Sequence, residues 1–436
     1  MGPSPHSTSP KPFPRPSPRC SPDLVRIRSA LLPWVAFAAV HAILIALCLF
    51  GPGQPLGDVD WVYRTWVTTA VSGGPVPGID VPFVYPVLAF VPMLAAHLLA
   101  PGAYALGWLA LVTLVDAGAF AVLLGRRRRP RRLAAAGWWL AFLLLQGPTA
   151  LARIDAIAVA LVIVALLVLA RYPAWGSALL TLAAWVKVWP AVVVGALVVT
   201  CRHRLRVVAA AAVTTVLVVA VALAVGSGGN VLSFITQQTG RGIQIEAPVA
   251  LPWLWQAALG GGSVIYYDRD ILTFQVSGAG TDVVSALMTP LLGLAVLGIL
   301  AFGWWAQRRA APFEALFPPL VLALTVALIA FNKVGSPQFI SWLAAPALLG
   351  IVLQGHRWRL PAALMLLLAA LTQVIYPYLY DWLLVANPAM LFVLTVRNVL
   401  EFVVLAVALR AVWTAGRRGS RLDTARDAPV ITATKE

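Results

Sequence analysis

Acidic residues are scarce in this chain, and three of the sixteen lie in one short stretch between two apolar segments. Asp58 and Asp60 stand in the run Gly57–Trp66, and Asp80 follows in the run Ile79–Pro86. A carboxylate beside a hydroxyl group can take its proton as the hydroxyl attacks, which is general-base catalysis. Each acid alone is also typical of a solvated loop, and Asp58 of a helix N-cap. The clustering favours Asp58 and Asp60 as candidate catalytic residues.

Aromatic side chains accompany these acids. Tyr63 and Trp66 come shortly after Asp60, and Tyr85 follows Asp80. Aromatic rings can stack on the apolar faces of sugars. We therefore expect Tyr63, Tyr85 and Asp80 to contact a substrate.

Further ionisable residues lie beside or inside apolar segments. Arg153 and Asp155 are two positions apart, so on a helix they do not face each other and are not a local ion pair. Lys187 lies deep in the apolar stretch 174–200, where a lysine costs about 2.5–3.5 kcal/mol to insert into a membrane. Function is therefore the first hypothesis for Lys187, with snorkelling at a helix end as the alternative.

Two polar segments supply more cations. Lys333 and Gln338 stand in Asn332–Gln338, where Lys333 and backbone N–H groups could bind a phosphate, although a plain turn between helices is the alternative. Arg241 and Glu246 stand in the run Gly240–Glu246. The cations suit a phosphate group and the acids suit activation of a hydroxyl. Because the sequence has no Walker loop and no dinucleotide fingerprint, a lipid-linked donor fits better than a soluble nucleotide.

The composition determines which elements must position these residues. Of the 436 residues, 61% are hydrophobic and 11% are charged, whereas soluble proteins have about half and about a quarter. This excludes a soluble enzyme, a disordered chain and a disulfide scaffold. The three cysteines follow no metal or disulfide pattern, and we expect neither metal nor cofactor. The net charge of +16 comes largely from short basic runs between apolar stretches, which are typical of membrane topology signals rather than of nucleic-acid binding.

The apolar segments predict membrane helices, since about 20 residues cross the hydrocarbon core and only helices satisfy the backbone there. With re-entrant segments included, we predict an all-α polytopic membrane protein of about 10–13 helices. The segments lie at about 31–50, 83–100, 103–124, 133–147, 154–170, 174–200, 207–225, 281–306, 313–331, 339–353, 360–376 and 391–413.

The basic runs predict the orientation of the chain, because they are expected on the cytoplasmic side. Three full crossings before Arg126 would place arginines outside, so we predict that 83–100 is re-entrant and that 174–200 is a broken hairpin. Both termini are then cytoplasmic, in a multi-pass protein of the plasma membrane whose candidate site faces the extracytoplasmic side. The predicted divisions are disordered tails at 1–29 and 416–436, a transmembrane domain at 30–415, and outer loops at about 51–82 and 226–280.

These motifs, in this order, resemble glycosyltransferase family 87, the polyprenol-phosphate-mannose-dependent mannosyltransferases of the C-type membrane superfamily. The similarity runs from the first helix to about residue 346, and the last two helices add little to it. It rests on Gly57-Asp58, Tyr63, Trp66, Val84-Tyr85-Pro86, Arg153-Ile-Asp155, Trp185–Pro190, Arg241–Glu246 and Lys333–Gln338.

The resemblance implies transfer of a mannosyl or other hexosyl residue from a polyprenyl-phosphate sugar to a glycolipid or lipoglycan, with inversion. It implies an aspartate of the first outer loop as the base, and Asp58 is favoured over Asp60 by its Gly-Asp-Val context. The residues implied for donor phosphate or substrate binding are Lys333, Lys187, Arg153, Arg241, Tyr63, Tyr85, Asp80, Asp155, Glu246 and Gln338. A transporter or lipid flippase is the alternative, but no internal repeat supports it. The expected partners are the sugar donor, the glycan acceptor and membrane lipids, without nucleic acid.

Overall fold

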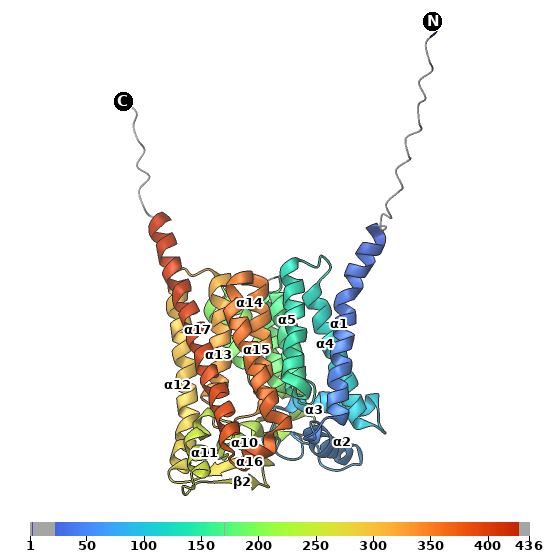
Figure 1. Cartoon of the computed structure of the whole chain (residues 1–436), viewed down its shortest axis with the longest axis vertical. Helices are drawn as coiled ribbons and strands as arrows, with labels where there is room; N and C mark the ends of the chain where they lie inside the picture. Colours follow the sequence, from blue (N-terminus) through green and yellow to red (C-terminus); the bar gives the residue numbers. More distant parts are fainter. Residues whose placement is uncertain (1, 3–21, 170, 427–436) are drawn as a thin grey trace.

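Long apolar runs form the predicted helical bundle in the computed structural model, which describes Gly2, residues 22–169 and residues 171–426 (Figure 1). Within these residues, eight helical stretches are long and apolar enough to cross a membrane. The prediction of an all-α polytopic membrane protein is thereby confirmed. The helices are α1 Pro22–Phe50, α2 Arg64–Val71, α3 Phe90–Leu99, α4 Tyr104–Leu124, α5 Pro130–Gln146, α6 Asp155–Leu169, α7 Pro173–Val186, α8 Pro190–Thr200, α9 Arg204–Ala224, α10 Ser233–Thr239, α11 Leu251–Ala258, α12 Thr281–Arg308, α13 Phe313–Ala330, α14 Ala344–Gln354, α15 Arg359–Gln373, α16 Tyr380–Leu384 and α17 Pro388–Arg426.

The segment 83–100 does not cross the bundle as one helix. Only its second half is α-helical, as α3, whose ten residues rise about 15 Å, or half of the hydrocarbon thickness. Figure 1 places α3 beside α2 at the lower end of the bundle. The prolines of this segment therefore predicted its interruption correctly.

The segment 174–200 is a hairpin broken near Lys187, as predicted. Ser177 of α7 donates a hydrogen bond to the backbone of Val207, and Trp185 donates to Thr215, so α7 and α9 run parallel. The intervening α8 must run in the opposite direction. Pro190 at the start of α8 explains the break, because a proline fits the first turn of a helix but not its interior.

The basic runs gather at one end of the bundle. Arg131, in the first turn of α5, donates to the carbonyl of Leu353 at the end of α14, at 3.1 Å. The guanidinium of Arg204 at the start of α9 lies 4.7 Å from the ring centre of Trp304 near the end of α12. Figure 1 shows α1 beginning and α17 ending at this same end. Its assignment to the cytoplasm stays a prediction.

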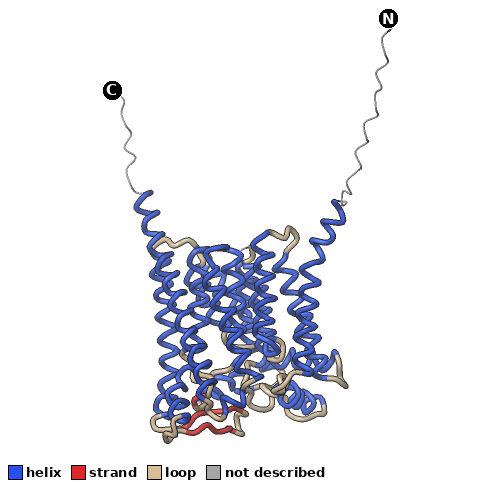
Figure 2. The backbone as a smooth tube through the Cα atoms, in the orientation of Figure 1, coloured by secondary structure: helices blue, strands red, loops and turns tan. Residues whose placement is uncertain are grey.

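The opposite end carries the two long loops and a small sheet that was not predicted from the sequence (Figure 2). Three antiparallel strands have the order β1-β3-β2, with Gln275 of β3 opposite Gln244 of β1 and Tyr266 of β2. The strand segments are rich in β-branched and aromatic residues, which favour extended backbone. The strands are β1 Ile243–Gln244, β2 Val264–Asp268 and β3 Thr273–Ser277.

The terminal helices extend into the segments predicted as tails. Helix α1 already begins at Pro22, and α17 continues to Arg426. Helix growth is cooperative once a turn exists, so an apolar span extends into flanking residues that lack a strong breaker. The rest of both predicted tails lies outside the described residues, apart from Gly2.

Candidate functional site

The candidate residues come together where helices break at the end of the bundle opposite the basic runs. Residues 58–63 form a π-helical turn after α1, and residues 147–154 separate α5 from α6. Residues 187–189 separate α7 from α8, and Lys187 itself has extended backbone. Each break releases the chain from helical geometry, so side chains from distant segments can converge.

Asp58 and Arg153 form an ion pair between the first loop and the break before α6. Asp58 Oδ2 lies 3.2 Å from Arg153 Nε. The side chain of Asp58 is 39% exposed, whereas that of Arg153 is 6% exposed. Arg153 therefore holds one carboxylate oxygen from the protein side, and a substrate can approach Asp58 from the other side.

Arg153 is fixed by three further acceptors. Its Nη1 donates to the carbonyl oxygens of Pro55 at 2.6 Å and Ala152 at 2.8 Å, and its Nη2 donates to the hydroxyl of Tyr376 at 2.8 Å. Burial lowers the pKa of Arg153, but Asp58 and Tyr376 outweigh burial and raise it above its usual value. The guanidinium is thus a permanent, immobilised cation.

Lys187 and Asp155 form a second ion pair beside the first. Lys187 Nζ lies 3.3 Å from Asp155 Oδ2, with exposed fractions of 15% and 1% for the two side chains. The other oxygen of Asp155 accepts a hydrogen bond from Trp342 Nε1 at 2.7 Å. The ammonium also lies 4.6 Å from the ring centre of Tyr85, within range of a cation–π contact. Lys187 is therefore anchored, but part of its surface stays open.

Aromatic rings form one wall of this region. Tyr85 lies near Tyr63 and Trp66, with ring centres 6.4 and 6.3 Å away, and the Tyr63 hydroxyl accepts a hydrogen bond from the backbone of Ile154. Burial raises the pKa of Tyr85. Lys187 acts against this shift, so the lysine and the phenol share one electrostatic environment.

The segment 241–247 and the loop 331–336 pack against each other. The backbone N–H of Gln244 donates to the carbonyl of Lys333 at 3.0 Å. A Cβ at Gly335 would collide with the backbone of Glu246 and Ala247, so only glycine allows this close approach. The loop therefore fixes the position of the segment that carries Arg241 and Glu246.

The side chain of Lys333 supports the same segment. Its Nζ donates to Ser285 Oγ at 3.3 Å, and Ser285 donates to the backbone oxygen of Arg241 at 3.0 Å. Ser285 lies in α12, so the lysine connects this helix to the loop before α14. Lys333 is thus part of the support of Arg241.

Arg241 contributes a buried polar group to this region. Its Nε is buried and has no hydrogen-bond partner among the described residues. Burial lowers the pKa of Arg241, whereas Tyr85 and Asp268 act in the opposite direction. A buried N–H group without a partner is costly, and a bound anion would satisfy it.

Glu246 is held by a third ion pair, from α17. Arg397 Nη1 donates to the backbone oxygen of Glu246 at 3.0 Å, and Arg397 Nη2 lies 3.8 Å from Glu246 Oε2. Arg397 also pairs with Glu401 at 3.6 Å. Burial raises the pKa of Glu246 to about 7, with Arg397 acting against this shift and Glu401 adding to it.

Three residues named from the sequence stand apart from these ion pairs. Asp60 is partly exposed and forms no ion pair with the described residues. Asp80 is exposed and accepts a hydrogen bond from the backbone N–H of Val76, within its own turn. Gln338 is buried in the turn after Lys333, and its Oε1 has no partner among the described residues.

Three residues that contact the candidate set were not predicted from the sequence. Tyr376 binds Arg153, Trp342 binds Asp155 and Arg397 binds Glu246. Two of them belong to the C-terminal part of the chain, from which little was expected. Arg397 and Glu401 are charged residues inside a mainly apolar run, and that anomaly was the signal able to reveal Arg397.

Residues 83–331 match glycosyltransferase family 87, which is more than half of the chain. The matched region includes Tyr85, Arg153, Asp155, Lys187 and Arg241, and it ends before Lys333. The first loop with Asp58 precedes it. No curated protein matches the chain.

Proposed function

The chain belongs to glycosyltransferase family 87 and is a membrane glycosyltransferase, and from this premise we propose that it moves a mannosyl or related hexosyl residue from a polyprenyl-phosphate sugar to a glycolipid or lipoglycan. The reaction takes place at the end of the bundle that carries Asp58. That end faces the extracytoplasmic side of the plasma membrane, since the basic runs occupy the other end.

One observation carries the mechanistic proposal, namely the contrast in exposure between the paired acids. Asp58 keeps 39% of its side chain exposed although Arg153 binds it, whereas Asp155 keeps 1% and is enclosed by its partners. Arg153 occupies only Oδ2 of Asp58, so Oδ1 can accept a hydrogen bond from a substrate hydroxyl. Asp58 is therefore the base we propose, and Asp60 is the second candidate.

The proposed reaction is a single displacement. The acceptor hydroxyl oxygen attacks the anomeric carbon of the sugar from the side opposite the phosphate, and its proton passes to Asp58. The bond between the anomeric carbon and the phosphate oxygen breaks, and polyprenyl phosphate leaves with both bonding electrons. Inversion at the anomeric carbon follows from this geometry.

The departing phosphate needs cations, and the site has them beside Asp58. We place Lys187 nearest the phosphate, because its ammonium is anchored by Asp155 and is still 15% exposed. Arg241 offers a buried guanidinium N–H without a partner among the described residues. Lys333 and Arg153 complete the cationic set. The partly exposed ring of Tyr85 provides the wall for the sugar, and the buried ring of Tyr63 supports it from behind.

A membrane assay with radiolabelled polyprenyl-phosphate-mannose tests the proposal. Membranes containing the wild-type chain are incubated with a panel of glycolipid and lipoglycan acceptors, and membranes containing Asp58→Asn serve as the matched control. Transfer that depends on Asp58 supports the proposal. Transfer to no acceptor, together with saturable transport of a lipid or solute, would favour a transporter instead.

A further inference from the structure

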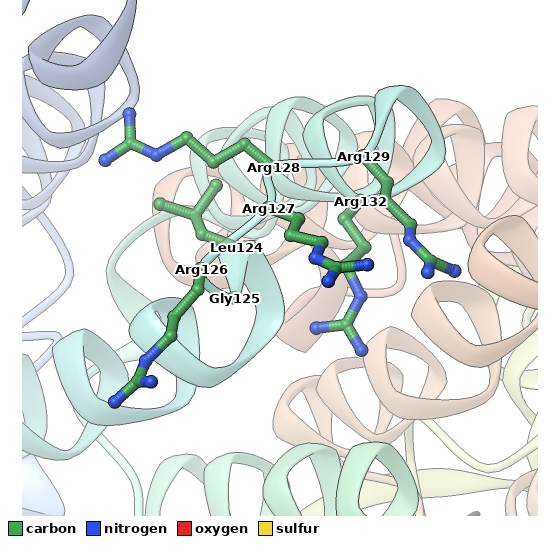
Figure 3. Close-up of a pocket in the computed structure, with 7 residues that line it drawn as sticks. All are labelled: Leu124, Gly125, Arg126, Arg127, Arg128, Arg129 and Arg132. Carbon is green, nitrogen blue, oxygen red and sulfur yellow. The ribbon is translucent and has the colours of Figure 1, made fainter.

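A cavity of about 330 Å³ opens at the turn between α4 and α5, at the end of the bundle opposite the candidate site (Figure 3). Five of its seven lining residues are arginines and none is acidic. The lining residues are Leu124, Gly125, Arg126, Arg127, Arg128, Arg129 and Arg132.

The guanidinium groups in this turn are divided between two directions. In Figure 3, Arg127, Arg129 and Arg132 extend to one side of the turn, whereas Arg126 and Arg128 extend away from them. No ion pair within the described chain includes Arg127, Arg129 or Arg132. Three like charges on one side of a short turn repel one another, and an anion between them would remove this repulsion.

One of the three arginines is held in place by the backbone. Arg132 Nη1 donates to the carbonyl oxygens of Val122 at 2.9 Å and Leu123 at 3.1 Å, in the last turn of α4. A Cβ at Gly125 would lie 2.9 Å from this same nitrogen, so glycine leaves room for the guanidinium. The cation is thus preorganised before any ligand arrives.

The position of the turn indicates the kind of anion. The candidate span Tyr104–Leu124 ends at the cavity, and the first residues of the span Pro130–Ala150 contribute Arg132 to its lining. The arginines therefore lie at the depth of lipid headgroups, and Leu124 lines the same cavity. A planar guanidinium group can bind two oxygens of one phosphate at once, so arginine suits a phosphate better than lysine does.

We propose that Arg127, Arg129 and Arg132 form a binding site for the phosphate of an anionic phospholipid. This site is separate from the catalytic end and independent of the sugar donor. Since a hydrogen bond to a charged group contributes about tenfold in binding, loss of two arginines that bind the phosphate should weaken lipid retention about 100-fold.

Native mass spectrometry of the full-length protein in neutral detergent tests the proposal. Dioleoyl phosphatidylglycerol is the probe, and dioleoyl phosphatidylcholine is the uncharged comparison. We expect the wild type to retain phosphatidylglycerol and Arg127→Gln/Arg129→Gln to lose most of it. The matched control Arg126→Gln/Arg128→Gln removes the same charge from the same turn. It should stay within about twofold of wild type, because these two side chains extend away from the other three arginines.

Three results would overturn the proposal. Equal losses in the two double variants would show attraction by overall charge alone. Equal retention of phosphatidylcholine would show that the phosphate charge is not recognised. Displacement of the lipid by millimolar inorganic phosphate would identify a free anion as the ligand. If Arg127→Gln/Arg129→Gln does not fold, Arg127→Lys/Arg129→Lys keeps the charge and should still bind several-fold more weakly than wild type.

Discussion

Arg153 Nε lies 3.2 Å from Asp58 Oδ2 and connects the loop after α1 to the break before α6. The same guanidinium also binds Tyr376 from the other end of the chain. Three distant segments thus determine where the Asp58 carboxylate lies. Accurate placement of a catalytic group is worth several orders of magnitude in rate, so this connection bears directly on catalysis.

The first prediction concerns Asp58 itself. Asp58→Asn keeps the shape of the side chain and a hydrogen-bond acceptor for Arg153, but it cannot take a proton. We expect turnover to fall by about 10²–10⁴-fold with donor binding nearly unchanged, which is the usual effect of removing a general base. Initial rates with radiolabelled donor, together with donor binding measured separately, check this expectation.

Asp60→Asn is the matched control for Asp58→Asn. Asp60 lies in the same π-helical turn and makes no ion pair with the described residues, so its variant should retain more activity. A larger loss in Asp60→Asn would make Asp60 the base. Near-normal turnover in both variants would remove the base from this loop.

The second prediction concerns the donor phosphate. Lys187→Gln removes the positive charge while keeping a hydrogen-bond donor for Asp155, so the fold is disturbed as little as possible. Loss of a desolvated cation from a bound phosphate should cost about 2–5 kcal/mol of binding free energy. Equilibrium binding of radiolabelled donor to the purified protein measures this cost.

Two further variants support the interpretation of Lys187→Gln. Arg204→Gln removes a cation at the opposite end of the bundle and should leave donor affinity unchanged. Lys333→Ala tests the second proposed cation, whose ammonium is bound to Ser285. Unchanged donor affinity in Lys187→Gln or in Lys333→Ala would exclude that lysine as a phosphate ligand.

Hydropathy and proline positions predicted much of the fold. The spans follow from the requirement that a backbone in lipid satisfies its own hydrogen bonds, and the breaks near Pro86 and Pro190 follow from the geometry of proline. The small sheet was missed because strands of two to five residues give a weak pattern inside a long polar loop. Its strands are stabilised by pairing between distant segments, which one segment alone does not reveal.

The candidate site was predicted as a set of residues but not as a set of partners. Scarcity of charge drew attention to Asp58, Arg153 and Lys187, because charges near lipid are costly. Pairing depends on how helices pack, and the sequence carries no direct record of that packing. Tyr376 and Trp342 were missed for this reason, since neither residue type is unusual in an apolar segment.

The third prediction concerns orientation, tested by cysteine labelling. In a background without the three native cysteines, Ser72→Cys and Gly262→Cys should react with an impermeant maleimide added to intact cells. Both positions are exposed in the loops near Asp58. Arg126→Cys and His356→Cys, exposed at the basic end, should react only after permeabilisation. Labelling at position 126 in intact cells would reverse the proposed orientation.

The fourth prediction concerns the pH dependence of stability through Glu246. Its pKa is raised to about 7 by burial, so between the usual carboxyl range and pH 7 the folded protein binds more protons than the unfolded chain. The contribution of Glu246 to stability is therefore greatest at low pH and falls as pH rises through about 7. Arg397 and Glu401 lie close to the same carboxyl, and both residues are unchanged in a variant that replaces Glu246 alone.

Glu246→Gln removes this titration. Thermal unfolding of wild type and Glu246→Gln in detergent, at intervals from about pH 5 to 8, gives the difference in midpoint as a function of pH. We expect the thermal midpoint of Glu246→Gln to rise relative to that of wild type as pH rises. If the difference in midpoint does not change with pH, Glu246 has the same pKa in the folded and unfolded states.

A pair inside the bundle joins His41 of α1 to Asp116 of α4. His41 Nδ1 lies 3.0 Å from the carbonyl oxygen of Phe37, which can only accept, so Nδ1 carries a proton. His41 Nε2 lies 3.2 Å from Asp116 Oδ2, and both side chains are at most 5% exposed. A single proton between Nε2 and the carboxyl oxygen then gives both groups a hydrogen-bond partner, whether the pair is neutral or ionised.

The last prediction concerns the stability that this pair provides. Loss of one partner leaves the other buried without its bond, which costs about 3–5 kcal/mol for an ion pair, whereas apolar replacement of both is often neutral. We therefore expect His41→Phe and Asp116→Leu each to lower the thermal midpoint in detergent, and the double variant to recover most of the loss. His41→Phe retains a ring for the stacking contact with Phe37, so packing is largely preserved. A double variant whose loss equals the sum of the single losses would show that the two residues contribute independently.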